Sequence, residues 1–168
     1  LYLIGNLNGD NLLQQLEKLE ATIQQENPQN NYTLLILGDV KSNPKNENAL
    51  AQYLKKTRTQ GAKVYAVSGD FDWDNSGYNG LDTVAEFQNE FKKLVEKNIF
   101  IPKHNCPGPY VKDVGEELRI VAINSQWWLH PYRKLLPTDS ECSEITIGQI
   151  LDEIKEANCS FLTFLHKK

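Results

Sequence analysis

The sequence contains no methionine, no long apolar run and no extended block of basic residues. A chain without an initiator methionine is expected to be a mature form or a fragment, from which a targeting segment can have been removed. No apolar stretch approaches the roughly 20 residues that a membrane-spanning helix needs. The net charge is −4 and the basic run at 55–58 is short, so the composition argues against a nucleic-acid-binding surface or one for anionic membranes.

Cysteine is also scarce, with three in 168 residues and no C-x-x-C pair, which argues against a structural zinc site. Cys106 and Cys142 occur in polar, turn-rich segments and can form a disulfide if the protein is exported. Cys159 precedes an apolar run and is predicted to be a small buried residue.

The first half of the chain alternates between strand and helix patterns. Apolar β-forming runs at 1–5, 32–37 and 62–67 are separated by helix-periodic segments, the first capped by Asp10 and the second covering 48–61. This alternation predicts a parallel sheet with right-handed crossovers. Ligands of such sheets gather beyond the carboxyl ends of the strands.

Each of the three predicted strands ends in glycine followed by a polar residue. The pairs are Gly5-Asn6, Gly38-Asp39 and Gly69-Asp70, and the last belongs to the acid-rich stretch VSGDFDWD. Glycine lets the backbone turn sharply and leaves the next side chain at the rim of the sheet. The pattern predicts a cluster of polar side chains there, which either hold a metal or bind nearby backbone amides.

The second half has a different order of elements. The periodicity predicts a helix over 81–97, a hairpin over 110–126, a helix from Thr146 to Ala157 and a strand ending at His166. His104 and His130 lie beside prolines and are expected at the surface. Trp127 and Trp128 are interpreted as packing residues rather than a ligand platform.

The ordered strand-end motifs GNLNG, LGDV, SGDFDW and FLHKK resemble those of the calcineurin-like metallophosphoesterases. The segments NCPGPYV and RIVAINSQWWLH further resemble a branch from Bacteroidetes-type bacteria, some members of which are fused to an Omp85-type outer-membrane barrel. The resemblance covers nearly the whole chain. It implies one partial domain over 1–168, an α/β fold with a β-sandwich flanked by helices, and a missing C-terminal part.

Family members hydrolyse phosphoesters between two metal ions, with a histidine as proton donor. The resemblance places Asn6 and Asn8 at the ligand positions of the first motif, where the family has stronger ligands. Phe71 stands at the proton donor's position, and it cannot donate. Asp72 matches the acid that orients that donor. These four positions are therefore interpreted as degenerate, and no catalytic residue is expected.

Three other positions keep groups that can bind a cation. Asp39 matches the bridging aspartate, Asp70 replaces an asparagine, and His166 stands where the family has a histidine pair. Together they can hold at most one weak Mg²⁺, Ca²⁺ or Mn²⁺ ion, and otherwise no cofactor is expected.

The resemblance thus implies a pseudoenzyme that acts as a structural or interaction module. The expected setting is extracytoplasmic, with a protein partner or a fused outer-membrane barrel, no nucleic acid and a Cys106–Cys142 disulfide. The alternative is an active metal-dependent phosphoesterase whose ligand set is completed by residues beyond Lys168. A third possibility is a domain stabilised by a single bound cation.

Overall fold

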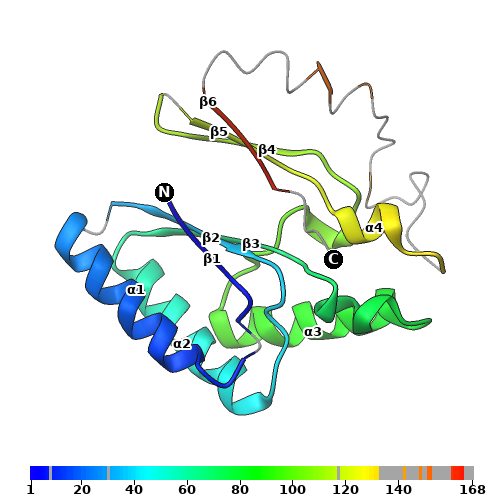
Figure 1. Ribbon diagram of the computed structural model, residues 1–168, viewed down its shortest axis with the longest axis horizontal. Coiled ribbons are helices and arrows are strands. Elements are labelled where there is room, and N and C mark those ends of the chain that lie inside the picture. Colours follow the sequence, from blue (N-terminus) through cyan, green and yellow to red (C-terminus); the bar gives the residue numbers. More distant parts are fainter. Residues whose placement is uncertain are drawn as a thin grey trace.

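The computed structural model describes residues 1–7, 9–29, 31–116, 118–132, 142, 148, 151–152 and 160–164. For residues 160–164 only the backbone is described. They form two three-stranded sheets that stack face to face, with helices over the outer face of the first sheet (Figure 1). The mixed α/β architecture expected from the sequence is confirmed. In chain order the elements are β1 (Tyr2–Gly5), α1 (Leu12–Glu26), β2 (Thr33–Leu37), α2 (Pro44–Thr59), β3 (Lys63–Val67), η1 (Phe71–Ser76), α3 (Gly80–Val95), η2 (Lys103–Asn105), β4 (Tyr110–Val114), β5 (Leu118–Ala122), α4 (Ser125–Leu129) and β6 (Ser160–Phe164).

The first sheet is parallel, in the order β1-β2-β3. Its central strand β2 is an apolar run in which Leu34, Leu35 and Ile36 are at most 1% exposed. Consecutive residues of a strand point to opposite faces, so both faces of β2 are covered. Gly5 pairs with Leu37 and Leu37 pairs with Val67, which aligns the carboxyl ends of all three strands at one edge.

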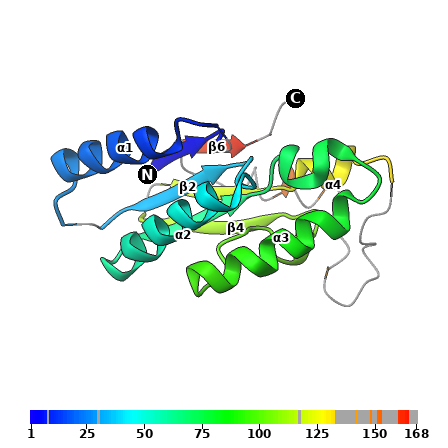
Figure 2. The ribbon, with the colours of Figure 1, turned by 90° about the horizontal axis from the view of Figure 1, so that it is seen from below.

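Helices α1, α2 and α3 lie side by side across one face of this sheet, with α2 in the middle (Figure 2). Their apolar sides and the sheet form the larger hydrophobic core, which includes Leu16, Leu54, Phe87 and Phe91. Every buried side chain of this core removes apolar surface from water, which is the main contribution to stability.

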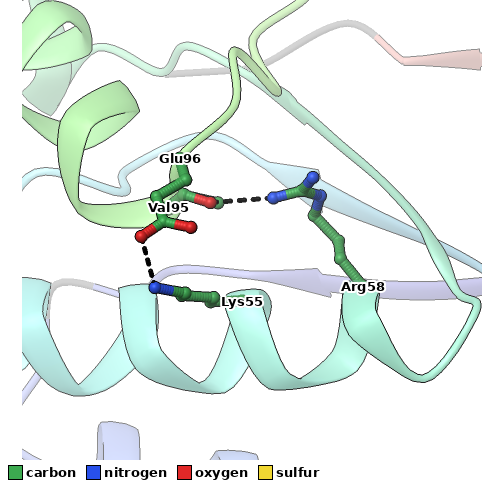
Figure 3. Close-up of polar contacts among 4 residues, drawn as sticks. All are labelled: Lys55, Arg58, Val95 and Glu96. Atoms are coloured by element: carbon green, nitrogen blue, oxygen red, sulfur yellow. Dashed lines mark hydrogen bonds and ion pairs between the residues drawn. The ribbon is translucent and has the colours of Figure 1, made fainter.

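The end of α3 is attached to α2 by two polar contacts (Figure 3). Arg58 Nη1 donates to the carbonyl of Val95 at 2.8 Å, and Lys55 forms an ion pair with Glu96. Glu96 adopts a left-handed conformation with φ 58°, so α3 ends at Val95, two residues before the predicted end. The ion pair is exposed and contributes at most about 1 kcal/mol.

The second sheet has the order β4-β5-β6 and packs on the other face of the first sheet. The predicted hairpin is confirmed over 110–122, where β4 and β5 are antiparallel and joined through Gly115, whose φ is 66°. Its predicted extension to residue 126 is wrong, because α4 begins at Ser125. The predicted final strand is also confirmed as β6, which pairs in parallel with β5. Between the sheets lie the buried side chains of Leu35, Ile101, Ile120 and Ala122.

The structure differs from the prediction at the starts of two helices and in the burial of one histidine. Asn11, not Asp10, occupies the N-cap of α1 and makes no side-chain bond to the helix amides. Helix α2 begins at Pro44, earlier than predicted, because Asn43 caps it by accepting from the Asn46 amide at 3.0 Å. His130 is 1% exposed, so its expected surface position is wrong. The predicted helix from Thr146 to Ala157 lies mostly outside the described residues.

The sulfur atoms of Cys106 and Cys142 lie 2.03 Å apart, so the structure joins these two residues as a disulfide. Both residues are buried. No helix in the part of the chain that the structure describes is long and apolar enough to cross a membrane.

Candidate functional site

The candidate site lies at the edge where the three parallel strands end. Asn6 follows β1 with φ 57°, Gly38 and Asp39 follow β2 with φ 75° and 53°, and Asp70 follows β3 after Gly69. Left-handed conformations at Asn6 and Asp39 turn the chain sharply at the sheet edge. Asn6, Asp39 and Asp70 therefore lie at one edge of the sheet, as the Gly-polar pattern of the sequence predicted.

Asp39 packs directly against Gly69 of the neighbouring strand end. A Cβ atom at position 69 would lie 2.4 Å from Asp39 Oδ1 and 2.6 Å from the Asp39 amide nitrogen, so only glycine fits there. The amide of Phe71 donates to Asp39 Oδ1 at 3.2 Å. Asp39 is thus attached to the loop that follows β3, and one of its oxygens is already hydrogen-bonded.

Asp72 is fully buried and joins two loops. Its Oδ1 accepts from the amide of Lys41 at 2.6 Å and its Oδ2 accepts from the amide of Gly69 at 2.8 Å. Burial raises the pKa of Asp72 to about 6, and the charge of Asp39 acts in the same direction; hydrogen bonds from the amides of Lys41, Gly69 and Val40 oppose the rise. The family resemblance implied that Asp72 has no histidine to orient. In the structure its carboxylate accepts hydrogen bonds from backbone amides instead.

Asp70 is engaged with the end of its own loop. Its Oδ1 accepts from Ser76 Oγ at 2.7 Å, and its carbonyl accepts from the amide of Asn75 at 3.0 Å. Ser76 Oγ also lies 3.2 Å from Oε1 of Gln126, a residue of α4 with 0% exposure. Neither Ser76 nor Gln126 was predicted from the sequence to be a site residue, although Gln126 belongs to the segment RIVAINSQWWLH.

The loop rests on a buried aromatic pair from the two halves of the chain. Trp73 is 0% exposed, and its ring centroid lies 5.2 Å from that of His130. Gly80 begins α3 against this pair: a Cβ there would lie 2.6 Å from the Trp73 carbonyl and 2.9 Å from His130 Cε1. The absence of a side chain at Gly80 therefore allows His130 to pack beneath the helix.

Phe71 is 38% exposed beside these acids, and Asn6 is exposed at the end of β1. Asn8 and His166 lie outside the described residues. Within the described ranges, no group of three or more His, Cys, Asp or Glu side chains could hold a metal ion. Asp72 is enclosed by backbone amides, and Asp39 and Asp70 each accept a hydrogen bond from the loop that follows β3.

A two-layer sheet arrangement with acids at the carboxyl ends of parallel strands defines the general class, an α/β domain with a rim site. The family model of calcineurin-like phosphoesterases matches residues 9–141, most of the chain, and the protein belongs to that family. Comparisons with curated proteins and with solved structures found no match.

The buried Asp72 predicts a specific pH dependence of stability. Its pKa in the folded state is about 6, above the usual 3.8, so the folded state binds a proton more tightly than the unfolded state. This contribution to stability is present below about pH 4 and is lost as the pH rises through about 6. The difference amounts to about 3 kcal/mol. We expect the free energy of unfolding, measured in urea, to fall with pH across this window by more in the wild type than in Asp72→Asn. Parallel pH profiles of the two proteins would contradict the assignment.

Proposed function

We propose that this domain is a catalytically degenerate calcineurin-like phosphoesterase that acts as a structural or interaction module. Phe71 is the observation that carries the proposal. A phenyl ring can neither protonate a leaving alkoxide nor bind a metal, and loss of a general acid typically costs about 10²–10⁴-fold in rate. The ring is partly exposed next to Asp70, where the family resemblance places the proton donor.

The hydrogen bonds of the three acids support the same proposal. Asp72 is used by backbone amides, Asp70 binds Ser76 and Asp39 binds the Phe71 amide. These contacts stabilise the loops without any bound ion. Without two bound metals, water at the site is not converted into a strong nucleophile at neutral pH. The chemistry that remains is that of a folded scaffold.

We place the module outside the cytoplasm, in an outer-membrane-associated protein or complex. A disulfide between Cys106 and Cys142 supports an oxidising compartment. The resemblance of NCPGPYV and SQWWL to the Bacteroidetes-type branch supports the link to the outer membrane. The partner is then a protein or a fused barrel.

The test is phosphatase activity with p-nitrophenyl phosphate and bis-p-nitrophenyl phosphate in millimolar Mn²⁺. We expect no turnover above the metal-only control, and none from Phe71→His, because restoring the acid does not restore the metals. Turnover near ordinary enzyme rates of about 1 s⁻¹ or more, abolished by Asp39→Ala, would disprove the proposal. Such a result would establish the alternative, an active phosphoesterase with an unusual ligand set.

Asp39 and Asp70 are carboxylates at neighbouring strand ends, so a metal ion can still bind there. Metal analysis of the purified protein therefore distinguishes the degenerate module from the active enzyme and from a domain with one bound cation. Two bound metals per chain would favour the active enzyme. A single ion whose removal by chelator lowers the melting temperature would indicate a residual Mg²⁺, Ca²⁺ or Mn²⁺ site, since a ligand that binds only the folded state stabilises it. We expect neither result.

A further inference from the structure

A cavity lies at the end of the first sheet opposite the candidate site. Helices α1 and α2 run side by side over this sheet (Figure 1), and a cavity of about 260 Å³ opens between their C-terminal halves and the start of β2. Tyr32, which directly precedes β2, lines the cavity, whereas the candidate site lies beyond Leu37 at the other end of the same strand. Any ligand of the cavity is therefore distinct from a ligand of the rim site.

The most deeply placed polar groups of the cavity are hydroxyls. Thr57 and Tyr32 are 3% and 8% exposed, and Tyr53 of α2 is half-buried beside them. Burial raises the pKa of Tyr53 to about 12; the neighbouring Tyr32 acts in the same direction, and a hydrogen bond with Thr57 opposes the rise. Burial also raises the pKa of Tyr32, again opposed by a hydrogen bond with Thr57. Both phenols therefore stay protonated at neutral pH, and because a hydroxyl has one proton and two lone pairs, the three groups keep hydrogen-bonding capacity for a ligand.

Two side-chain amides, one from each helix region, line the cavity closer to solvent. Gln24 belongs to α1 and Gln60 is the C-cap residue of α2, and both are exposed. Neither side chain is hydrogen-bonded to another residue in the part of the chain that the structure describes. A primary amide both donates and accepts hydrogen bonds, so each can bind a hydroxyl group in either sense.

The charges that line the cavity cancel. Glu20 of α1 and Lys56 of α2 are the charged residues among those that line it, and Lys56 Nζ lies 2.6 Å from Glu20 Oε1. The two charges are thus already paired with each other. A charged ligand gains little net attraction from a neutral pair, and it would have to compete for a partner that is engaged. The lining therefore favours an uncharged ligand.

The size of the cavity limits the ligand further. Its volume of about 260 Å³ corresponds to roughly eight or nine water molecules at about 30 Å³ each. It lies below the range of about 300–1,000 Å³ for sites of drug-sized ligands. One sugar ring fits such a space and a nucleotide does not. The buried side chain of Ile23 and the tyrosine rings supply apolar surface for the C–H groups of a ring.

We propose that this cavity binds a monosaccharide or a cyclic polyol of the same size. Such a ligand is uncharged and carries hydroxyl groups around an apolar ring, which matches the hydroxyls, amides and apolar surface of the lining. A buried polar group that lacks a hydrogen-bond partner is costly, so a ligand with many hydroxyls suits this lining better than an apolar one. The inference adds a small-molecule binding activity that does not depend on the proposed structural or interaction role.

The binding test titrates the isotope-labelled whole chain with D-glucose, D-galactose, D-mannose or myo-inositol and follows the backbone amide resonances by NMR. We expect at least one compound to shift the amides of residues 20–28 and 53–60 in a saturable manner. The Kd should lie in the millimolar range, because one small ring offers few contacts. The amides of residues 69–76 at the candidate site should not move. Absence of saturable shifts with every compound, or shifts centred on residues 69–76, overturns the proposal.

Substitutions that remove single hydroxyls test whether the cavity itself is the binding site. Tyr53→Phe keeps the ring and Thr57→Val keeps the shape of the side chain, and each should raise Kd roughly 3- to 10-fold, as expected for one lost hydrogen bond. Tyr65→Phe is the matched control, because it makes the same change at a residue packed between the two sheets, and it should leave Kd unchanged. Urea unfolding checks that every variant is folded.

Two results of these controls would overturn the proposal. The first is an equal effect of Tyr53→Phe and Tyr65→Phe on Kd, which would place the sugar elsewhere. The second is tighter binding of the charged analogues D-glucuronate or D-glucosamine than of the parent sugars, which would contradict an uncharged ligand. No readout is phosphatase activity, so this proposal can fail while the catalytic one stands.

Discussion

Replacing Asp72 with alanine is expected to lower the free energy of unfolding by about 2–4 kcal/mol at neutral pH. The variant removes the acceptor of the Lys41 and Gly69 amides, at 2.6 and 2.8 Å, and of the Val40 amide. Each buried donor left unsatisfied costs roughly 1–3 kcal/mol. The gain from removing a buried carboxylate offsets part of this cost. The net loss should lower the melting temperature by roughly 5–15 °C.

The control for this experiment is Asp10→Ala, an exposed aspartate in the turn before α1. We expect it to change stability by no more than about 0.5 kcal/mol, as for most surface substitutions. Urea unfolding followed by circular dichroism measures both variants. If Asp72→Ala were no more destabilising than Asp10→Ala, the carboxylate would not be what connects the loops after β2 and β3.

Local sequence patterns were sufficient to predict most of the fold. The apolar run of β2 and the three Gly-polar strand ends are short-range signals, and they correctly indicated a parallel sheet with its rim residues together. The order of the motifs then indicated the family, which the match over residues 9–141 confirmed. Helix ends were predicted less well. Asn43 caps the start of α2 and Glu96 ends α3 in a left-handed conformation, and hydrophobic periodicity does not reveal such capping residues.

The contacts inside the candidate site could not be predicted, because they join residues far apart in the chain. Asp72 binds the amide of Lys41, Ser76 approaches Gln126, and Trp73 packs on His130. Hydrophobic periodicity and propensity carry no information about such pairings. His130 follows α4 and precedes a proline, which suggested a surface loop, and only the close approach permitted by Gly80 explains why it is buried.

The disulfide is expected to provide the largest single contribution to stability. Cys106 and Cys142 are separated by 36 residues. Closing a loop of this length in the unfolded chain corresponds to about 4 kcal/mol in the chain-entropy model. We therefore expect the double variant Cys106→Ala, Cys142→Ala to unfold at lower urea concentration, with a free energy of unfolding smaller by roughly 3–4 kcal/mol.

Reduction provides the internal control for the same measurement. Dithiothreitol should destabilise the wild type and Cys159→Ala to a similar extent, and it should leave the double variant unchanged because that protein has no bridge to break. Thiol titration under denaturing, non-reducing conditions should find a single reactive cysteine per wild-type chain and none in Cys159→Ala. If all cysteines of the wild type reacted, or if reductant shifted the double variant as much as the wild type, the bridge would be ruled out. The support it gives to an extracytoplasmic location would then be lost, while the hydrogen bonds of Asp72 and the argument from Phe71 would be unaffected.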